Sequence, residues 1–355
     1  MKLRHKIAGT LALPLALAIA STANAATVVD TDAHTLKIGG FVGATAGWTI
    51  FDDAGPAQDS DVDFGMGLGV SRLNIAYTQK TAAGNITYLY ENDWAGKPVA
   101  NGGNYRLRHA VIKYDGWSAG YTWSAFANLT GLAETIDAAG TSGISATAPR
   151  TASLGKDIKI ADGMSVGLFV EDNSHPFNTS TSDRAASGAK LEADGTIVNA
   201  ESRTNTAVPD VVANFKGDFG VAQAFAAVRM IQVEKNGGGS EGTEGEVDFT
   251  VGVNSQIDAL NLKAAVTSFD SGDLGASVAA QYKFTDQIRA NLVVEQFVGD
   301  TNNTDRTGVW VNGFYKMDAG WEWGAELRSV SADAGKVNGL GDKDMSFTLQ
   351  AKYAF

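Results

Sequence analysis

The sequence predicts an all-β fold: a transmembrane antiparallel β-barrel of sixteen strands, with eighteen as the alternative. Three observations predict it. Short and long connections alternate along the chain, and after residue 25 there is no run of ~18 apolar residues that could form a membrane helix. The third is the alternation in residues 345–355, where polar residues oppose one apolar face made of Met345, Phe347, Leu349, Ala351, Tyr353 and Phe355. A chain that crosses a bilayer without helices must form a closed barrel.

The first 25 residues read as a secretory signal peptide. Basic residues at positions 2, 4 and 6 precede an apolar stretch at 7–20, and Ala23-Asn24-Ala25 is a small-residue cleavage site. We expect cleavage after Ala25, which leaves residues 26–355 as a single barrel domain. The fold is expected to begin near Thr35, with no strand before it.

Charge and cysteine content narrow the function classes. The 355 residues contain no cysteine, which excludes disulfides and thiolate metal sites. Loss of the signal peptide's three cations takes the formal net charge from −12 to −15, which argues against nucleic acid as a partner. Neither a cofactor nor a metal site is indicated by the motifs.

Seven short connections carry turn-forming residues, several of them the Asp-Gly pair that closes hairpins; they lie at 82–84, 115–116, 162–163, 216–218, 257–259, 285–287 and 318–320. Eight longer ones are rich in Gly, Asn and Asp, and lie at about 52–62, 94–103, 125–147, 173–207, 233–246, 270–273, 300–307 and 332–344. Together they join sixteen strands with both ends on the short-turn side, as in bacterial outer-membrane barrels.

Individual strands support this count unevenly. Alternation is clear at 117–124 and 276–284, whereas residues 150–160 show a muddled pattern and form the weakest strand. Residues 189–200 have a hairpin signature of their own. As membrane strands they would give eighteen, but their short, charged arms favour a hairpin outside the membrane. The tryptophans fall near predicted strand ends and are expected in the interfacial girdles: Trp48, Trp94, Trp117, Trp123, Trp310, Trp321 and Trp323.

The third long loop, at about 125–147, is expected to fold into the barrel. It carries Leu129, Leu132 and Ile136, an apolar content that is unusual for a loop in solvent, and loops of this length usually have a function. Glu134 and Asp137 would then stand in the pore. The alternative is an ordinary solvated acidic loop.

Arginines on the predicted strands supply the opposite charge. Parity places Arg72, Arg106 and Arg108 on the interior face, with Tyr105, Leu107 and Val111 toward lipid, and His109 on the outward face. Arg289 and Arg328 add interior charge from later strands, accompanied by Glu295, Glu322 and Glu326. Arginines facing a loop with carboxylates would create a transverse field that favours anionic solutes. The alternative is that they only pair with neighbouring acids and hold the wall.

Residues 105–110 (YRLRHA), 120–126 (GYTWSAF) and 134–137 (ETID) resemble the corresponding run of the DcaP-like outer-membrane porins. The resemblance covers about residues 105–140. It implies a homotrimer of sixteen-stranded channels that takes up dicarboxylates and other small anions. It matches Arg106 and Arg108 to the family's paired arginines, and Glu134 and Asp137 to its inward loop. The terminal Phe355 is similar to the signal read by the barrel assembly machinery.

The sequence therefore indicates a channel rather than an enzyme, placed in the bacterial outer membrane among its lipid and lipopolysaccharide. Its expected function is passive uptake of small hydrophilic solutes, with a preference for anions. A non-selective diffusion porin is the alternative. An outer-membrane enzyme is a remote one, because His34, His109 and His175 are not placed beside a Ser and an acid by local sequence.

Overall fold

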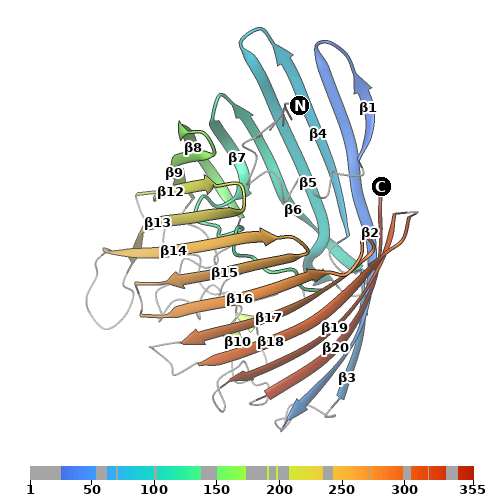
Figure 1. Cartoon of the computed structure of the whole chain (residues 1–355). Coiled ribbons are helices and arrows are strands. Elements are labelled where there is room, and N and C mark those ends of the chain that lie inside the picture. The colour runs from blue at the N-terminus through green and yellow to red at the C-terminus, as the bar shows by residue number, and fades with distance from the viewer. Residues whose placement is uncertain are drawn as a thin grey trace, which may run out of the picture.

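The structure is a computed structural model that describes residues 25–52, 62–68, 71–99, 102–136, 150–172, 190–191, 197–198, 208–234, 243–270, 272–298, 305–318, 320–332 and 343–355. Eighteen strands of this described part form one antiparallel sheet, and two more form a separate pair (Figure 1). Their bounds are β1 Ala26–Asp30, β2 His34–Asp52, β3 Val62–Gly67, β4 Arg72–Thr81, β5 Gly84–Val99, β6 Gly102–Tyr114, β7 Trp117–Trp123, β8 Arg150–Ala161, β9 Met164–Glu171, β10 Lys190–Leu191, β11 Ile197–Val198, β12 Asp210–Asp218, β13 Ala222–Glu234, β14 Thr243–Ile257, β15 Leu260–Ser268, β16 Leu274–Lys283, β17 Ile288–Val298, β18 Arg306–Lys316, β19 Trp321–Ala332 and β20 Lys343–Ala354.

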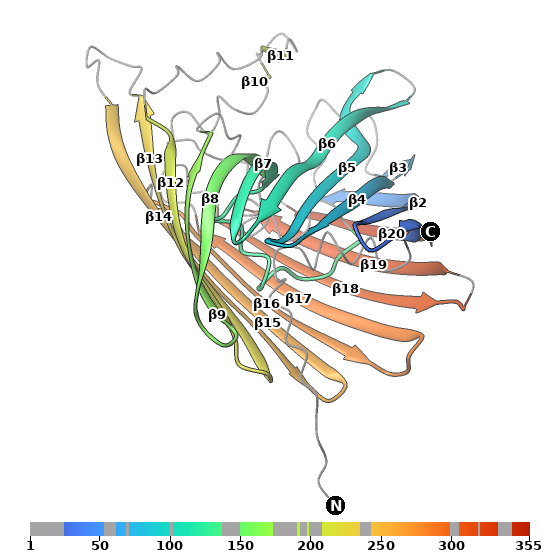
Figure 2. The same cartoon turned by 90° about the horizontal axis from the view of Figure 1, so that it is seen from above.

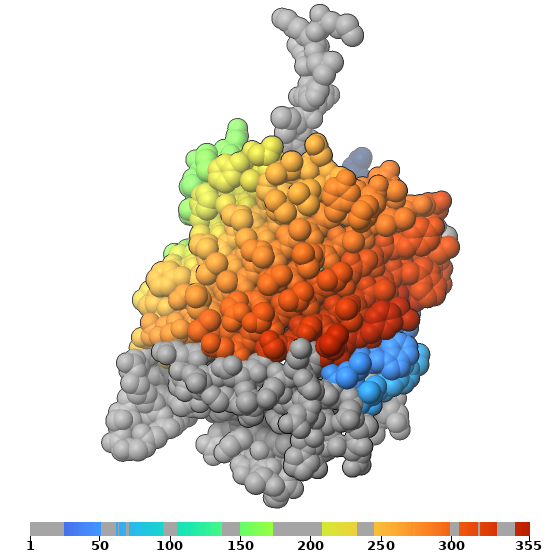
Figure 3. Space-filling view, turned by 60° about the horizontal axis from the view of Figure 1, so that its bottom comes forward, coloured from blue at the N-terminus to red at the C-terminus, as the bar shows by residue number. Residues whose placement is uncertain are grey.

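The sheet closes into a barrel because its last strand pairs with its first long one. β20 pairs with β19 on one side and with β2 on the other, in a register that runs from Phe41 opposite Ala354 to Asp52 opposite Lys343. In the space-filling view the red of β20 adjoins the blue of the N-terminal strands (Figure 3). The closed antiparallel barrel predicted from the sequence is confirmed.

The eighteen strands of this sheet occupy sixteen positions around the barrel. β3 and β4 share one position, because β2 pairs with β4 through residues 34–41 and with β3 through residues 45–50. β1 pairs with β2 at residues 35–38, and so continues the line of β20 beyond its last residue. Sixteen positions agree with the predicted count.

Ser71 bridges the gap between β3 and β4. Its buried hydroxyl accepts a hydrogen bond from the Gly43 amide at 2.9 Å and lies 2.7 Å from the Leu68 carbonyl, to which it donates. A side chain thus replaces a missing ladder bond at a point where the backbone of β2 would otherwise lack a partner.

The prediction that no strand precedes residue 35 is wrong. β1 forms a hairpin with β2, closed by a bond from the Thr31 amide to the His34 carbonyl. All five of its residues are exposed, so the segment lacks the one-sided apolar pattern by which strands are recognised. Beside β1, a Cβ on Gly39 would lie 2.6 Å from the Ala25 Cβ and 3.1 Å from the Phe355 carbonyl oxygen, so Ala25, which precedes β1, and Phe355, which follows β20, are neighbours.

β10 and β11 pair only with each other, in a two-stranded sheet apart from the barrel (Figure 2). The eighteen-stranded alternative is therefore wrong. The predicted signal peptide, except Ala25, lies outside the described residues.

Some predicted connections are misplaced. β5 runs to Val99 and β6 begins at Gly102, so most of the predicted loop at 94–103 is strand. The turn predicted at 216–218 lies at 219–221, because β12 continues to Asp218. The weak strand near 150–160 exists as β8 and pairs on both sides, with a register shift only at its end, between Lys159 and Ala161.

The outer face carries exposed apolar side chains, as the barrel requires, and five of the seven tryptophans are among them: Trp48, Trp94, Trp117, Trp321 and Trp323. Trp310 was expected there too but is 2% exposed. It shares the inward parity of Asn312 and Phe314 on β18, and the missing side chain of Gly308 makes room for its ring. No helix in the described residues is long and apolar enough to cross a membrane.

We expect Ser71→Ala to destabilise the barrel by about 1–3 kcal/mol, because the buried Gly43 amide would lose its acceptor. Urea unfolding of refolded protein in detergent, followed by tryptophan fluorescence, measures the change. The exposed Ser268 provides the control: Ser268→Ala should unfold as the wild type does, and equal stability of the two variants would contradict the bridging role of Ser71.

Candidate functional site

The interior of the barrel is a wall of polar and charged side chains. On β9, Val166, Leu168 and Val170 are exposed outward, whereas the alternate residues Ser165, Phe169 and Glu171 are buried. The same two-residue period puts Asp248 and Thr250 of β14 on the inner face. An interior built of such groups is expected to hold water rather than a packed core.

One loop runs along this wall. Residues 124–136, here called the inward loop, leave β7 and contact strands from β9 to β19. Most contacts are hydrogen bonds: Ser124 to Glu171 on β9 (2.6 Å), Asn214 on β12 to the Ala125 carbonyl (2.9 Å), Asn128 to Thr250 on β14 (2.8 Å), and Lys263 on β15 to the Leu132 carbonyl (2.9 Å). The loop therefore lies against the inner wall over a large part of its circumference.

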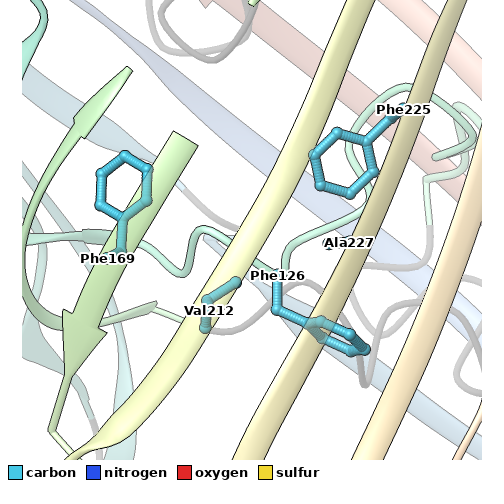
Figure 4. Close-up of a cluster of buried hydrophobic side chains, with 5 residues drawn as sticks. All are labelled: Phe126, Phe169, Val212, Phe225 and Ala227. Carbon is cyan, nitrogen blue, oxygen red and sulfur yellow. The ribbon is translucent and has the colours of Figure 1, made fainter. Parts of the chain in front are cut away.

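An apolar cluster holds the start of the inward loop. Phe126 is fully buried, and it forms a cluster with Phe169, Val212, Phe225 and Ala227 from β9, β12 and β13 (Figure 4). The guanidinium of Arg229 lies 4.8 Å from the centre of the Phe126 ring and pairs with Asp248. Burial of this large side chain inside a polar barrel explains why the loop turns inward rather than outward.

Further along the inward loop, Glu134 is bound to the wall by charge. Arg289 on β17 donates to both of its carboxylate oxygens, one of them at 2.9 Å, and Gln281 on β16 donates at 2.7 Å. Arg289 also pairs with Glu322 on β19 at 2.9 Å, and Glu322 pairs with Lys352 on β20 at 2.6 Å. The network joins the loop to four strands next to the barrel closure.

The loop backbone is fixed at the same place. Asn312 on β18 donates to the Glu134 carbonyl at 3.0 Å, and the Ile136 amide donates to Glu326 on β19 at 2.8 Å. Asn312 also donates to Glu326 at 2.9 Å, so one carboxylate organises both contacts. Charge-assisted bonds of this kind are about twice as strong as neutral ones.

Three arginines come together on another part of the wall, on β4 and β6. Arg106 forms a two-bonded pair with Asp93 on β5, at 2.9 and 2.7 Å. Arg108 bonds both Glu91 (2.7 Å) and Asp93 (2.6 Å), and Arg72 lies 3.7 Å from Glu91. Arg108 is almost fully buried, whereas 42% of the Arg106 side chain is exposed.

A β-bulge explains why this part of the wall differs from strand parity. Glu91 pairs with His109 but Asn92 pairs with Leu107, so Arg108 is an extra residue in β6. His109 is 1% exposed, and its ring nitrogen lies 2.9 Å from the Thr122 hydroxyl. The expectation that His109 faces outward is wrong, and Val111, expected toward lipid, packs against Leu89.

The remaining predicted site residues are separate from the arginine group. Arg328 lies on the interior face of β19, where its ladder neighbours are Trp310 and Ser346. Arg289 and Glu134 contact each other rather than acting as separate charges. Asp137 lies outside the described residues.

Glu91 and Asp93 are the site residues that sequence reasoning missed. They are two residues apart, and so share a face of the strand that follows the turn at 82–84, directly opposite the strand that carries the arginines. This two-residue spacing is the sequence signal from which Glu91 and Asp93 could be predicted as partners of the arginines. They pair with Arg106 and Arg108, so these arginines contact acids of the neighbouring strand, which is the alternative that the sequence leaves open. Among the described residues, no group of three or more His, Asp or Glu side chains could hold a metal ion.

Known structures share this architecture. The outer-membrane channel DcaP of Acinetobacter baumannii aligns with a TM-score of 0.72 and 18% identity over 93% of this chain and all of that one. An anion-selective porin from Comamonas acidovorans aligns at 0.62 and 12% over 91% and 100%, and Salmonella typhi OmpF, solved with daunomycin, at 0.62 and 14% over 92% and 99%. No family model matches, and no curated sequence is significantly similar. The predicted resemblance to DcaP-like porins is confirmed at the level of the fold.

We expect Asp93→Asn to destabilise the barrel by about 3–5 kcal/mol, because it leaves Arg106 and Arg108 with one carboxylate fewer in a buried network. The measurement is urea unfolding in detergent. Asp162→Asn is the control, since Asp162 pairs with Lys159 in an exposed turn where ion pairs contribute little. Similar stability of the two variants would show that the arginine group does not depend on Asp93.

Proposed function

We propose that this protein is a passive channel of the bacterial outer membrane for small hydrophilic solutes. One observation carries the proposal: the inward loop lies along the inner wall of a closed sixteen-stranded barrel. A barrel of this size is too wide for side chains alone to fill, so a loop laid against its wall narrows a water-filled path. The shared fold of three outer-membrane channels and porins supports this.

We propose further that the channel prefers anions. Arg72, Arg106 and Arg108, with Arg150 of β8 close enough to interact with all three, carry four positive charges against two negative charges on Glu91 and Asp93, which leaves an excess of two. Arg106 keeps much of its side chain exposed, and a guanidinium binds carboxylates through two parallel bonds. Arg328 would add positive charge to the lining, whereas Glu134 would neutralise the charge of Arg289. One structural neighbour is itself described as anion-selective.

Dicarboxylates as solutes follow from the resemblance to the DcaP-like porins and stay a proposal, as does a homotrimeric assembly. We also propose that the outer face contacts lipid and lipopolysaccharide, and that the barrel assembly machinery recognises Phe355. Asp137 is kept as a proposed pore residue on sequence grounds alone.

A non-selective diffusion porin is the second candidate, and a specific observation favours it. Arg106 and Arg108 both already bond the Asp93 carboxylate. Their charges are therefore partly neutralised, and a passing solute meets a weaker electric field. The two candidates differ in ion selectivity, which can be measured directly.

We expect wild-type channels in planar bilayers to show an anion-selective reversal potential in a KCl gradient, and Arg106→Gln to shift it toward cations. Asp93 keeps Arg108 as a partner in this variant, so the barrel should still fold. Lys156→Gln makes the same charge change on the outer face, where Lys156 lies opposite the outward-facing Leu168, and should leave the potential unaltered. A dicarboxylate such as succinate should reduce the wild-type current and affect Arg106→Gln less.

The absence of cysteine offers an independent check. In Arg106→Cys the single thiol should react with a negatively charged thiosulfonate reagent and the current should fall during recording. An unreactive thiol, or a wild-type reversal potential near zero, would favour the diffusion porin over the anion-preferring channel.

A further inference from the structure

The inward loop touches the wall closely at three glycines, one in the loop and two in the strands. Gly131 is the loop's own. A Cβ at Gly131 would lie 2.4 Å from the Cβ of Ala265 and 2.7 Å from the carbonyl oxygen of Ala264, both on β15. Because these are backbone and near-backbone atoms, the strand cannot give way, and only a glycine allows the loop to come so near.

The second glycine, Gly252, belongs to β14. A Cβ there would lie 2.1 Å from the side-chain oxygen of Asn128 in the inward loop. The Asn128 amide occupies the space left by the missing side chain, and its nitrogen donates to the Thr250 hydroxyl and the Val251 carbonyl, each at 2.8 Å. The Asn128 oxygen in turn accepts a bond from the Gly131 amide at 3.2 Å, which links the first two glycines.

The third glycine, Gly324 on β19, lies under the other end of the described loop. A Cβ there would meet the Cδ1 atom of Ile136 at 2.8 Å and the ring of Phe314 at 2.9 Å. Ile136 is buried, and its amide is bonded to Glu326 two residues further along the same strand. The Ile136 side chain thus fills a depression in the wall that a larger residue would close.

We infer that Gly131, Gly252 and Gly324 are specificity-determining residues, which set the width of the constriction by letting the inward loop lie flat against the wall. The inference rests on the proposed channel function but not on its ion preference. A methyl group on Gly131 would meet backbone atoms of β15, so it must displace the loop toward the pore axis by a distance on the order of one carbon–carbon bond, ~1.5 Å. At Gly252 and Gly324 the methyl group would meet the ends of the Asn128 and Ile136 side chains, which can move, so these substitutions displace the loop less. A narrower aperture passes smaller solutes and less current.

Gly43 provides a comparison, because it has no such contact with the inward loop. Gly43 on β2 is buried, yet a Cβ there would lie 3.5 Å from its nearest neighbour, the Ala351 carbonyl oxygen, an ordinary contact. Gly43→Ala therefore adds the same methyl group to the same barrel without disturbing the inward loop, and it serves as the matched control.

The test is single-channel conductance in KCl for Gly131→Ala, Gly252→Ala, Gly324→Ala and Gly43→Ala, with liposome swelling in neutral sugars of increasing size. Recordings report only channels that have folded and inserted. We expect Gly131→Ala to lower the conductance and exclude the larger sugars, whereas Gly43→Ala matches the wild type. Conductance in Gly131→Ala equal to or above that of the wild type would overturn the inference.

A double-variant cycle provides a second measurement. Asn128→Ala removes the side chain that a methyl group on Gly252 would displace, so Gly252→Ala should lower the conductance less in that background than alone. Equal effects in both backgrounds would count against the inference. Failure of the channel function is a separate outcome, because it would appear as wild-type protein that passes neither ions nor sugars.

Discussion

The structure depends on one constraint: in hydrocarbon every backbone amide and carbonyl must find its partner within the protein. A closed antiparallel ladder meets it, and the details of this barrel serve the closure. β20 pairs with β2 along twelve residues, β1 takes over the edge of β2 beyond Phe355, and Ser71 supplies a side-chain bond where the ladder is interrupted. Because the backbone uses its bonds in the wall, the interior side chains are left to determine chemistry.

Those side chains neutralise one another in local groups. Glu134, Arg289, Glu322 and Lys352 form one group, and the β4–β6 arginines with Glu91 and Asp93 form another. Paired charges hold long side chains in place, which keeps the wall rigid and the aperture fixed. In the proposed channel, selectivity would depend on the small excess of charge in each group and on which guanidinium keeps an exposed edge, rather than on a uniform field across the lumen.

Much of this fold could be predicted from alternation and turn residues. β16 and β20 follow a two-residue period, and Asp-Gly marks the turns at Asp115 and Asp162.

The predictions that failed have local causes. The bulge at Arg108 shifts parity by one residue, so strand parity predicts the wrong face for His109 and Val111. Trp310 faces inward because it shares the parity of Asn312 and Phe314, and Gly308 leaves room for its ring. Partners such as Glu134 and Arg289 are 155 residues apart, and no local pattern predicts that they meet.

β1 and β20 lie end to end along the same side of β2, which gives the barrel the topology of a ring that is open between residues 26 and 355. The longest-range strand pairing joins β2, which is synthesised early, to β20, which is synthesised last. β2 therefore keeps an unpaired edge until β20 has been made. The entropy cost of closing a loop of nearly the whole chain falls on this one pairing step. The same geometry would allow a circular permutation of the chain. A peptide link between residues 355 and 26, with new ends at an exposed turn such as 162–163, would preserve every rung of the ladder while changing the order in which they form.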